Sequence, residues 1–282
     1  MVTISLNNEL AKKLDQGMRA GDAVELPFPV VYVWALNGQP SYKSQGGALY
    51  YGGWACTAED LIAVADQQGL SVPEWKQATI ASRDGGEYEA FTTRNIVVAP
   101  IGKRESWLYD NKRYADYVDG GRRHLQVLAY LAESKGSNGS GHFEPWAPVV
   151  LTAKGYQARN LLDAFNLWNK ATAPIRWKAA PGVPAWCFYL SLGTYGKERH
   201  VMNVGKPGAQ SPITPITAYL PESFDEDLIS SLFVGEELAE KMAELQDQAS
   251  DWLGAWKETA LSEESQETDF MEDEPQMEDI PF

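Results

Sequence analysis

Short apolar runs rich in β-branched and aromatic residues, separated by Gly, Asn, Asp and Pro, dominate residues 1–221. This pattern predicts β-strands at 24–36, 75–82, 88–101, 124–132, 149–151, 186–192 and 213–219. Helical spacing of apolar residues is rarer and predicts an N-terminal helix with Leu6, Leu10 and Leu14 on one face, ended by Gly21-Asp22, and helices at 57–68 and 152–169. Many short strands with few helices between them indicate an antiparallel or mixed sheet instead of a parallel doubly wound one.

A different pattern begins after Pro221. Apolar residues there are spaced four and three apart, which predicts an acidic amphipathic helix over 222–257. The apolar seam of this helix consists of Leu238, Met242, Leu245, Ala249, Trp252 and Trp256. Because the seam covers only about two and a half heptads, it is compatible both with docking onto the preceding body and with dimerisation.

Charge divides the chain into two parts. Residues 1–221 contain 22 basic and 19 acidic residues, whereas residues 222–282 contain 2 basic and 20 acidic residues. The formal net charge of −15 therefore hides a mildly basic body. Such a body can bind a polyanion, and an acidic tail can compete for the same surface, most strongly at low salt.

The C-terminal segment has a composition that cannot order itself. Residues 262–282 include nine acidic residues and no Lys or Arg, so they bury too little apolar surface to fold. We expect a disordered acidic tail over 258–282. Its last four residues, Asp279, Ile280, Pro281 and Phe282, form an apolar tip with a carboxylate, which indicates a ligand for a pocket on another protein.

This tip resembles the C-terminal end of the bacterial single-stranded DNA-binding proteins, whose acidic tails finish in a nearly identical Asp-Ile-Pro-Phe. The match covers Asp279 to Phe282 with acids before them, and the body shows no recognisable copy of the family's DNA-binding domain. The resemblance implies that the tip recruits replication, recombination and repair proteins. Together with the strand pattern it favours an α+β, mainly β fold: an OB-like antiparallel barrel elaborated with helices.

Sequence-tolerant binding of single strands requires cations along the backbone and aromatic faces for the bases. One segment of the body supplies both, and its turn signals at 110–111 and 119–121 indicate exposure. Its candidate residues are Lys103, Arg104, Trp107, Tyr109, Lys112, Arg113, Tyr114, Tyr117, Arg122 and Arg123. The alternative is that some of these rings pack in the core and the cations are ordinary surface charge.

A second candidate is Arg176, Trp177 and Lys178, where Trp177 can stack on a base or cover the core. The tyrosine-rich stretch 42–54 is a third and weaker one because it holds a single Lys.

The body lacks the motifs of common enzymes. It contains no Walker loop, Gly-x-Gly-x-x-Gly, His-Glu-x-x-His or Gly-x-Ser-x-Gly, and its three His and two Cys lack the spacing of a zinc site. The sequence therefore predicts no catalytic activity, cofactor or metal. It also lacks a signal peptide or a membrane-spanning run, and Cys56 and Cys187 stand in apolar contexts, so we expect a cytoplasmic protein with reduced thiols.

These features predict a protein with three parts: a nucleic-acid-binding body (1–221), an acidic helix (222–257) and a tail with a partner-binding tip (258–282). The predicted function is to coat single-stranded DNA and to recruit genome-maintenance proteins, and the large body suggests a bacteriophage or mobile-element version. The partners are single-stranded DNA and the recruited proteins, and homo-oligomers are compatible with the seam. The alternative is an adaptor or inhibitor that engages host proteins through the tip without coating DNA.

Overall fold

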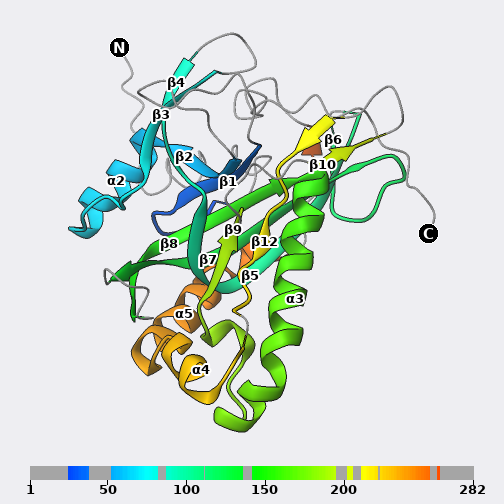
Figure 1. Ribbon diagram of the computed structural model, residues 1–282. Coiled ribbons are helices and arrows are strands. Elements are labelled where there is room, and N and C mark those ends of the chain that lie inside the picture. Colours follow the sequence, from blue (N-terminus) through cyan, green and yellow to red (C-terminus); the bar gives the residue numbers. More distant parts are fainter. Residues whose placement is uncertain are drawn as a thin grey trace, which may run out of the picture.

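The computed structural model describes residues 25–37, 52–81, 87–110, 112–135, 142–194, 202–205, 211–221, 223–254 and 259–260. Its strands are β1 (Val31–Asn37), β2 (Gly52–Thr57), β3 (Lys76–Ala81), β4 (Glu87–Thr93), β5 (Asn95–Tyr109), β6 (Lys112–Tyr114), β7 (Arg122–Lys135), β8 (His142–Lys154), β9 (Leu190–Gly193), β10 (Met202–Val204), β11 (Ser211–Ile213), β12 (Thr217–Ala218) and β13 (Thr259–Ala260). Strands β10 and β11 form a separate pair, and the others form one 11-stranded sheet (Figure 1).

The fold is mixed α/β, with a large and mostly antiparallel sheet. Its strand order is β12-β9-β5-β7-β8-β1-β2-β4-β3, with β6 on β5 and β13 on β6, and only the β1–β8 pair is parallel. The path ends at β12 and β3, which do not pair with each other among the described residues. The sheet is therefore not closed, and the OB-like barrel that the strand count favoured is not confirmed.

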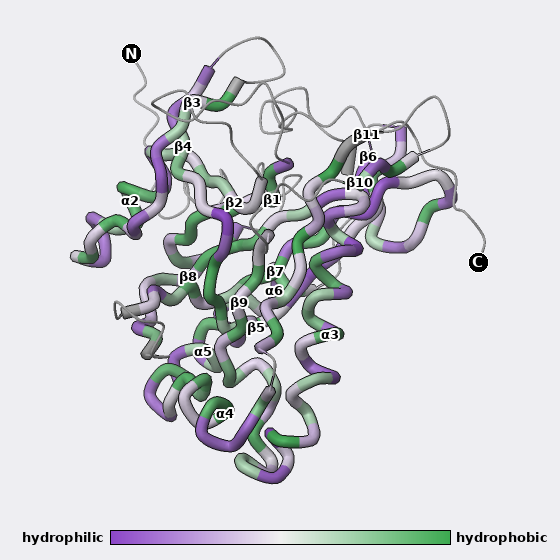
Figure 2. The backbone as a smooth tube through the Cα atoms, in the orientation of Figure 1, coloured by the Kyte–Doolittle hydropathy of each residue, from purple (hydrophilic) through white to green (hydrophobic). Residues whose placement is uncertain are grey.

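Three helices cover one face of the sheet: α2 (Ala58–Gln68), α3 (Gly155–Ala179) and α4 (Glu226–Leu232). The predicted signals of α2 are confirmed, since the Thr57 side chain accepts a hydrogen bond from the Asp60 N–H at 3.2 Å and Gly69 ends the helix in the left-handed conformation. Helix α3 begins later than the prediction of 152–169, because β8 continues to Lys154, and it extends beyond the predicted end to Ala179. Figure 2 shows the hydrophobic stretches gathered in the central strands.

The apolar seam of the C-terminal helices packs against the other face of the sheet. Helices α5 (Glu236–Gln248) and α6 (Ser250–Leu253) bury Leu238, Met242, Leu245, Ala249 and Trp252 against Ala99, Ile101, Leu128, Tyr130 and Val150. Gly102 permits this approach, since a Cβ atom there would lie 2.7 Å from Leu253 Cδ2. Of the two alternatives for the seam, docking onto the body is the one that the structure shows. Trp256 and the predicted N-terminal helix lie outside the described residues.

Other strands differ from prediction in their bounds. The run 88–101 is divided at Arg94 into β4 and β5, and β5 continues to Tyr109. The short strand at 149–151 is the central part of β8, and residues 185–187 form a 3-10 turn instead of the start of β9.

Candidate nucleic-acid interface

The basic and aromatic segment at 103–123 forms one end of the sheet, where β5, β6 and β7 lie side by side. Trp107 pairs with Tyr114 of β6 and with Arg123 of β7. The predicted turns fall between these strands, at Asp110 and at 119–120, but most of the segment is strand instead of loop. The residues therefore divide between two faces of the sheet.

Residues directly opposite each other in an antiparallel pair project to the same face. The register therefore places part of the predicted site on one face, which we call the aromatic face: Lys103, Trp107, Tyr109, Lys112, Tyr114 and Arg123. Tyr117 joins it from the following turn, with its ring centroid 4.7 Å from that of Trp107. Tyr109 and Tyr117 are 44% and 54% exposed, and Lys103 and Lys112 are exposed as well.

Trp107 packs against two other residues of the aromatic face, Tyr117 and Arg123. The Trp107 and Tyr117 rings meet edge to face at an interplanar angle of 84°, and the Arg123 guanidinium carbon lies 4.9 Å from the Trp107 ring centroid. Arg123 also pairs with Glu105, with 3.6 Å between Nε and Oε2. The rings that present surface to a ligand are consequently Tyr109 and Tyr117, with Trp107 holding Tyr117 in place.

Arg104 lies on the opposite face and is buried. Its Nε donates a hydrogen bond to Gln126 Oε1 at 2.9 Å, and its guanidinium carbon lies 3.9 Å from the ring centroid of Trp252. Burial lowers the pKa of Arg104 to about 9, so the group stays charged at neutral pH. Arg104 holds α6 against β5, and we therefore leave it out of the interface that the sequence assigned to it.

Arg113 also projects to the opposite face, where it contacts a buried histidine. It donates hydrogen bonds to Ser106 Oγ at 2.9 Å and to His124 Nδ1 at 2.7 Å. Because Arg offers only donors, Nδ1 must be the acceptor and His124 must be neutral. Burial is the main cause that lowers the pKa of His124, and the positive charges of Lys154, Arg113, Arg104 and Arg122 lower it further.

Acidification is expected to destabilise the fold through His124. The unfolded side chain takes up a proton near pH 6.5, whereas the folded one does so only at lower pH. Between these two pKa values the unfolded state binds more protons, so stability falls by up to about 1.4 kcal/mol for each unit that the pH is lowered. Urea unfolding of the wild type and of His124→Gln at several pH values between about 7.5 and 5.5 measures this slope.

In His124→Gln, the amide oxygen can still accept from Arg113, but no proton is taken up. The free energy of unfolding of the variant should depend less on pH than that of the wild type. Equal slopes of this free energy against pH would contradict a buried neutral His124. Since His142 and His200 are present in both proteins, the difference isolates His124.

Sequence reasoning missed Lys154. It ends β8 opposite His124 and, like Arg122, is half-buried. No local motif marks it, because its position beside the basic segment depends on the pairing of β7 with β8.

The second predicted group lies at the far end of α3, where Trp177 and Lys178 are exposed and Arg176 is not. Arg176 is buried, with its guanidinium carbon 5.4 Å from the Trp168 ring centroid, and Lys178 forms an ion pair with Glu226 of α4. Trp177 is 72% exposed, so it does not cover the core. These residues do not join the aromatic face. A helix of 25 residues spans about 37 Å, and α3 starts beside β7 and ends here.

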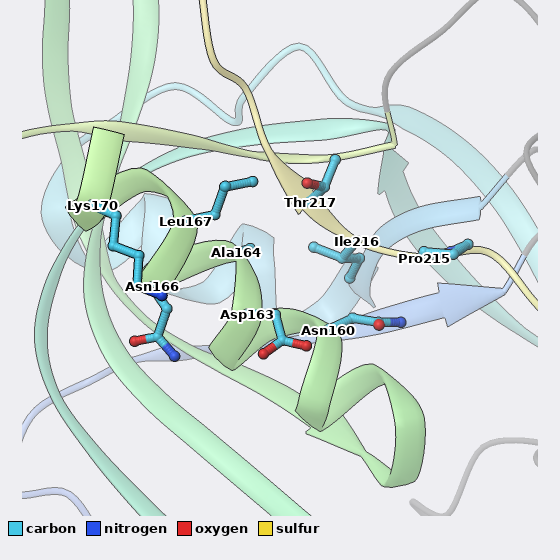
Figure 3. Close-up of a pocket in the computed structure, with 9 residues that line it drawn as sticks. All are labelled: Asn160, Asp163, Ala164, Asn166, Leu167, Lys170, Pro215, Ile216 and Thr217. Carbon is cyan, nitrogen blue, oxygen red and sulfur yellow. The ribbon is translucent and has the colours of Figure 1, made fainter. Parts of the chain in front are cut away.

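A groove of about 440 Å³ separates α3 from the segment at β12 (Figure 3). Ala164 and Leu167 of the helix face Ile216 and Thr217 across it. Its lining includes one cation, Lys170, together with Asp163. This near balance of charge distinguishes the groove from the basic end of the sheet, so the groove has no charge that favours binding of a polyanion.

The remaining predicted residues lie outside the part that the structure describes. They are Asp279, Ile280, Pro281 and Phe282, with the rest of 261–282, and most of the third candidate stretch at 42–54. Thr259 and Ala260 form β13, which pairs with Arg113 and Lys112 of β6. The chain thus passes next to a basic strand immediately before its acidic C-terminal segment.

Comparison with protein-family models, with curated proteins and with solved structures finds no match. Within the described ranges, no helix combines the length and the apolar character needed to cross a bilayer. The same ranges contain no group of three His, Cys, Asp or Glu side chains placed to hold a metal ion. The geometry of the sheet end is thus the basis of the functional proposal.

Proposed function

We propose that the protein binds single-stranded DNA, without catalysing a reaction on it, through the β5–β6–β7 end of the sheet. The observation that carries this proposal is the pair of exposed rings, Tyr109 and Tyr117, with the exposed Lys112 directly opposite Tyr109. The exposed Lys103 lies on the same face, six residues before Tyr109 along β5. Each stacked base contributes roughly 1 to 3 kcal/mol, and the lysines supply the contacts to phosphate. Arg122, Arg123 and Lys154 surround this end and add positive potential.

The second part of the proposal concerns recruitment. Asp279 to Phe282 would bind a pocket on replication, recombination or repair proteins, as the resemblance of the tip implies. The acidic residues before the tip follow β13 in the chain, and β13 lies on β6. A short acidic segment that starts at a basic strand can compete with DNA for it, and this competition should weaken as salt is added.

Titration with poly-dT at two salt concentrations tests binding, and removal of residues 275–282 tests recruitment. We expect the ten Trp residues to report binding by a fluorescence change, with affinity falling as salt rises. The truncated chain should bind DNA as tightly as the full chain or more tightly, and it should lose capture of partner proteins.

Two outcomes would contradict the proposal separately. Equal affinity for single-stranded and double-stranded oligonucleotides, or no affinity, would exclude the DNA-binding function. Capture of partners that survives the truncation would exclude the tip. If capture depends on the tip while DNA does not bind, the protein is the adaptor or inhibitor that the sequence left as the alternative.

A further inference from the structure

Three large aromatic side chains are exposed at the C-terminal end of α3. Trp177 at the end of this helix is 72% exposed, Trp186 in η1 (Ala185–Cys187) is 51% exposed, and Phe233 after α4 is 36% exposed. Aromatic residues on a surface are typical of the anchors of protein interfaces. None of the three belongs to the aromatic face of the candidate interface.

The segments that carry these rings contact one another. Phe188 packs on Phe233 with 5.7 Å between ring centroids, and the Arg176 guanidinium carbon lies 5.6 Å from the Phe188 ring. Cys187 accepts a backbone hydrogen bond from Val234 at 3.1 Å. Trp177, Trp186 and Phe233 therefore stand on one packed unit, which we call the acidic-end surface.

The charge around this surface selects its partner. Residues 223–254 contain nine acidic side chains, all exposed, and Lys241 as their one cation. Three of these acids, Asp225, Glu226 and Asp227, lie at the start of α4 beside this surface, and the other six lie on α5 and α6, which pack on the other face of the sheet. Lys178, the neighbour of Trp177, pairs with Glu226. A polyanion is repelled here, whereas a surface with exposed cations and apolar rings is complementary.

This chain carries such a surface at its other end. The aromatic face exposes Lys103, Lys112, Tyr109 and Tyr117, and α3 separates it from the acidic end by about 37 Å. Figure 2 shows hydrophilic stretches at β6 and along α4, on opposite ends of α3. We propose that a second copy of this chain docks its aromatic face on the acidic-end surface, so that copies associate head to tail.

Contacts between two different surfaces repeat without closing, unless the rotation between copies happens to form a ring. Association should therefore grow with concentration and weaken with salt, because complementary charges drive it. Self-association does not require DNA binding. If the proposed function also holds, single-stranded DNA and the neighbouring copy use the same face, and DNA should take the chains apart.

Sedimentation velocity of the full chain over a range of concentrations, at about 50 mM and about 500 mM salt, tests this proposal. We expect species larger than a dimer at low salt and monomers at high salt. Two variants define the contact: Trp177→Ala/Trp186→Ala removes the acidic-end anchors, and Lys103→Glu/Lys112→Glu reverses the charge of the aromatic face. Each variant alone should associate at least about tenfold more weakly than the wild type.

An equimolar mixture of the two variants gives the decisive readout. Each retains the surface that the other lacks, so the mixture should form a dimer and stop there. A wild type that is monomeric at both salt concentrations, or association that survives in either variant, would overturn the proposal. Because all four residues lie on the surface, unchanged circular dichroism and unfolding midpoints should show that the variants are folded.

Addition of oligo-dT to the wild type at low salt separates this inference from the proposed function. Disassembly into DNA-bound monomers would support both the head-to-tail association and the proposed DNA binding. Assemblies that ignore the oligonucleotide, while the two variants behave as predicted, would leave head-to-tail contact standing and would exclude DNA binding by the aromatic face.

Discussion

Replacement of Trp252 by alanine is expected to lower the free energy of unfolding by about 3 to 5 kcal/mol. The Trp252 ring is 1% exposed between α6 and the sheet, and its loss leaves a cavity there. It also removes the ring that covers the guanidinium of Arg104, a group that is itself buried. Urea unfolding followed by far-ultraviolet circular dichroism measures the change.

Trp177→Ala is the matched control, because the same side chain is removed from a site that is 72% exposed. Its effect on the free energy of unfolding should stay within about 0.5 kcal/mol. If the free energy of unfolding falls equally little in both variants, α6 does not pack on β5 in solution, and the docking of the seam on the sheet is wrong. A lower m-value in Trp252→Ala alone would instead indicate that α5 and α6 separate from the sheet before it unfolds.

The two buried arginines of the predicted sites, Arg104 and Arg176, show what the sequence does and does not contain. On α3, Trp168, Thr172 and Arg176 are four residues apart and share a helical stripe, so the burial of Arg176 was predictable from spacing. Arg104 is different. Once residues 103–109 are known to form a strand, alternation separates Lys103 from Arg104, but the turn signals in this segment indicated a loop and hid that alternation.

Long-range pairing is the part that local patterns could not supply. The heptad spacing predicted one amphipathic helix over 222–257, whereas the structure has three shorter helices there, α4, α5 and α6. Only packing against Ala99, Leu128 and Val150 decides that the seam docks. In the same way, Lys154 reaches His124 through the register of β7 with β8. This register depends on the length of the loop between the two strands and on how far each strand continues, and the sequence predicted shorter strands, at 124–132 and 149–151.

The double variant Tyr109→Ala/Tyr117→Ala is expected to lose roughly 2 to 6 kcal/mol of binding free energy for poly-dT, since each stacked base contributes about 1 to 3 kcal/mol. This corresponds to a rise in Kd of at least about 30-fold. Both rings are exposed, so their removal should change the free energy of unfolding little. Fluorescence anisotropy with labelled oligo-dT measures the Kd across a range of salt concentrations.

Charge provides the control that separates stacking from general attraction to phosphate. The tyrosine variant removes no cation, so its affinity should fall while the slope of log K against log salt stays that of the wild type. Lys103→Ala/Lys112→Ala should instead reduce this slope by about 0.7 for each phosphate that the lysines no longer neutralise. Tyr109→Phe/Tyr117→Phe keeps both rings and should bind nearly as the wild type does. If the phenylalanine and alanine variants bind alike, the bases do not stack on these rings, and the aromatic face is not where DNA binds.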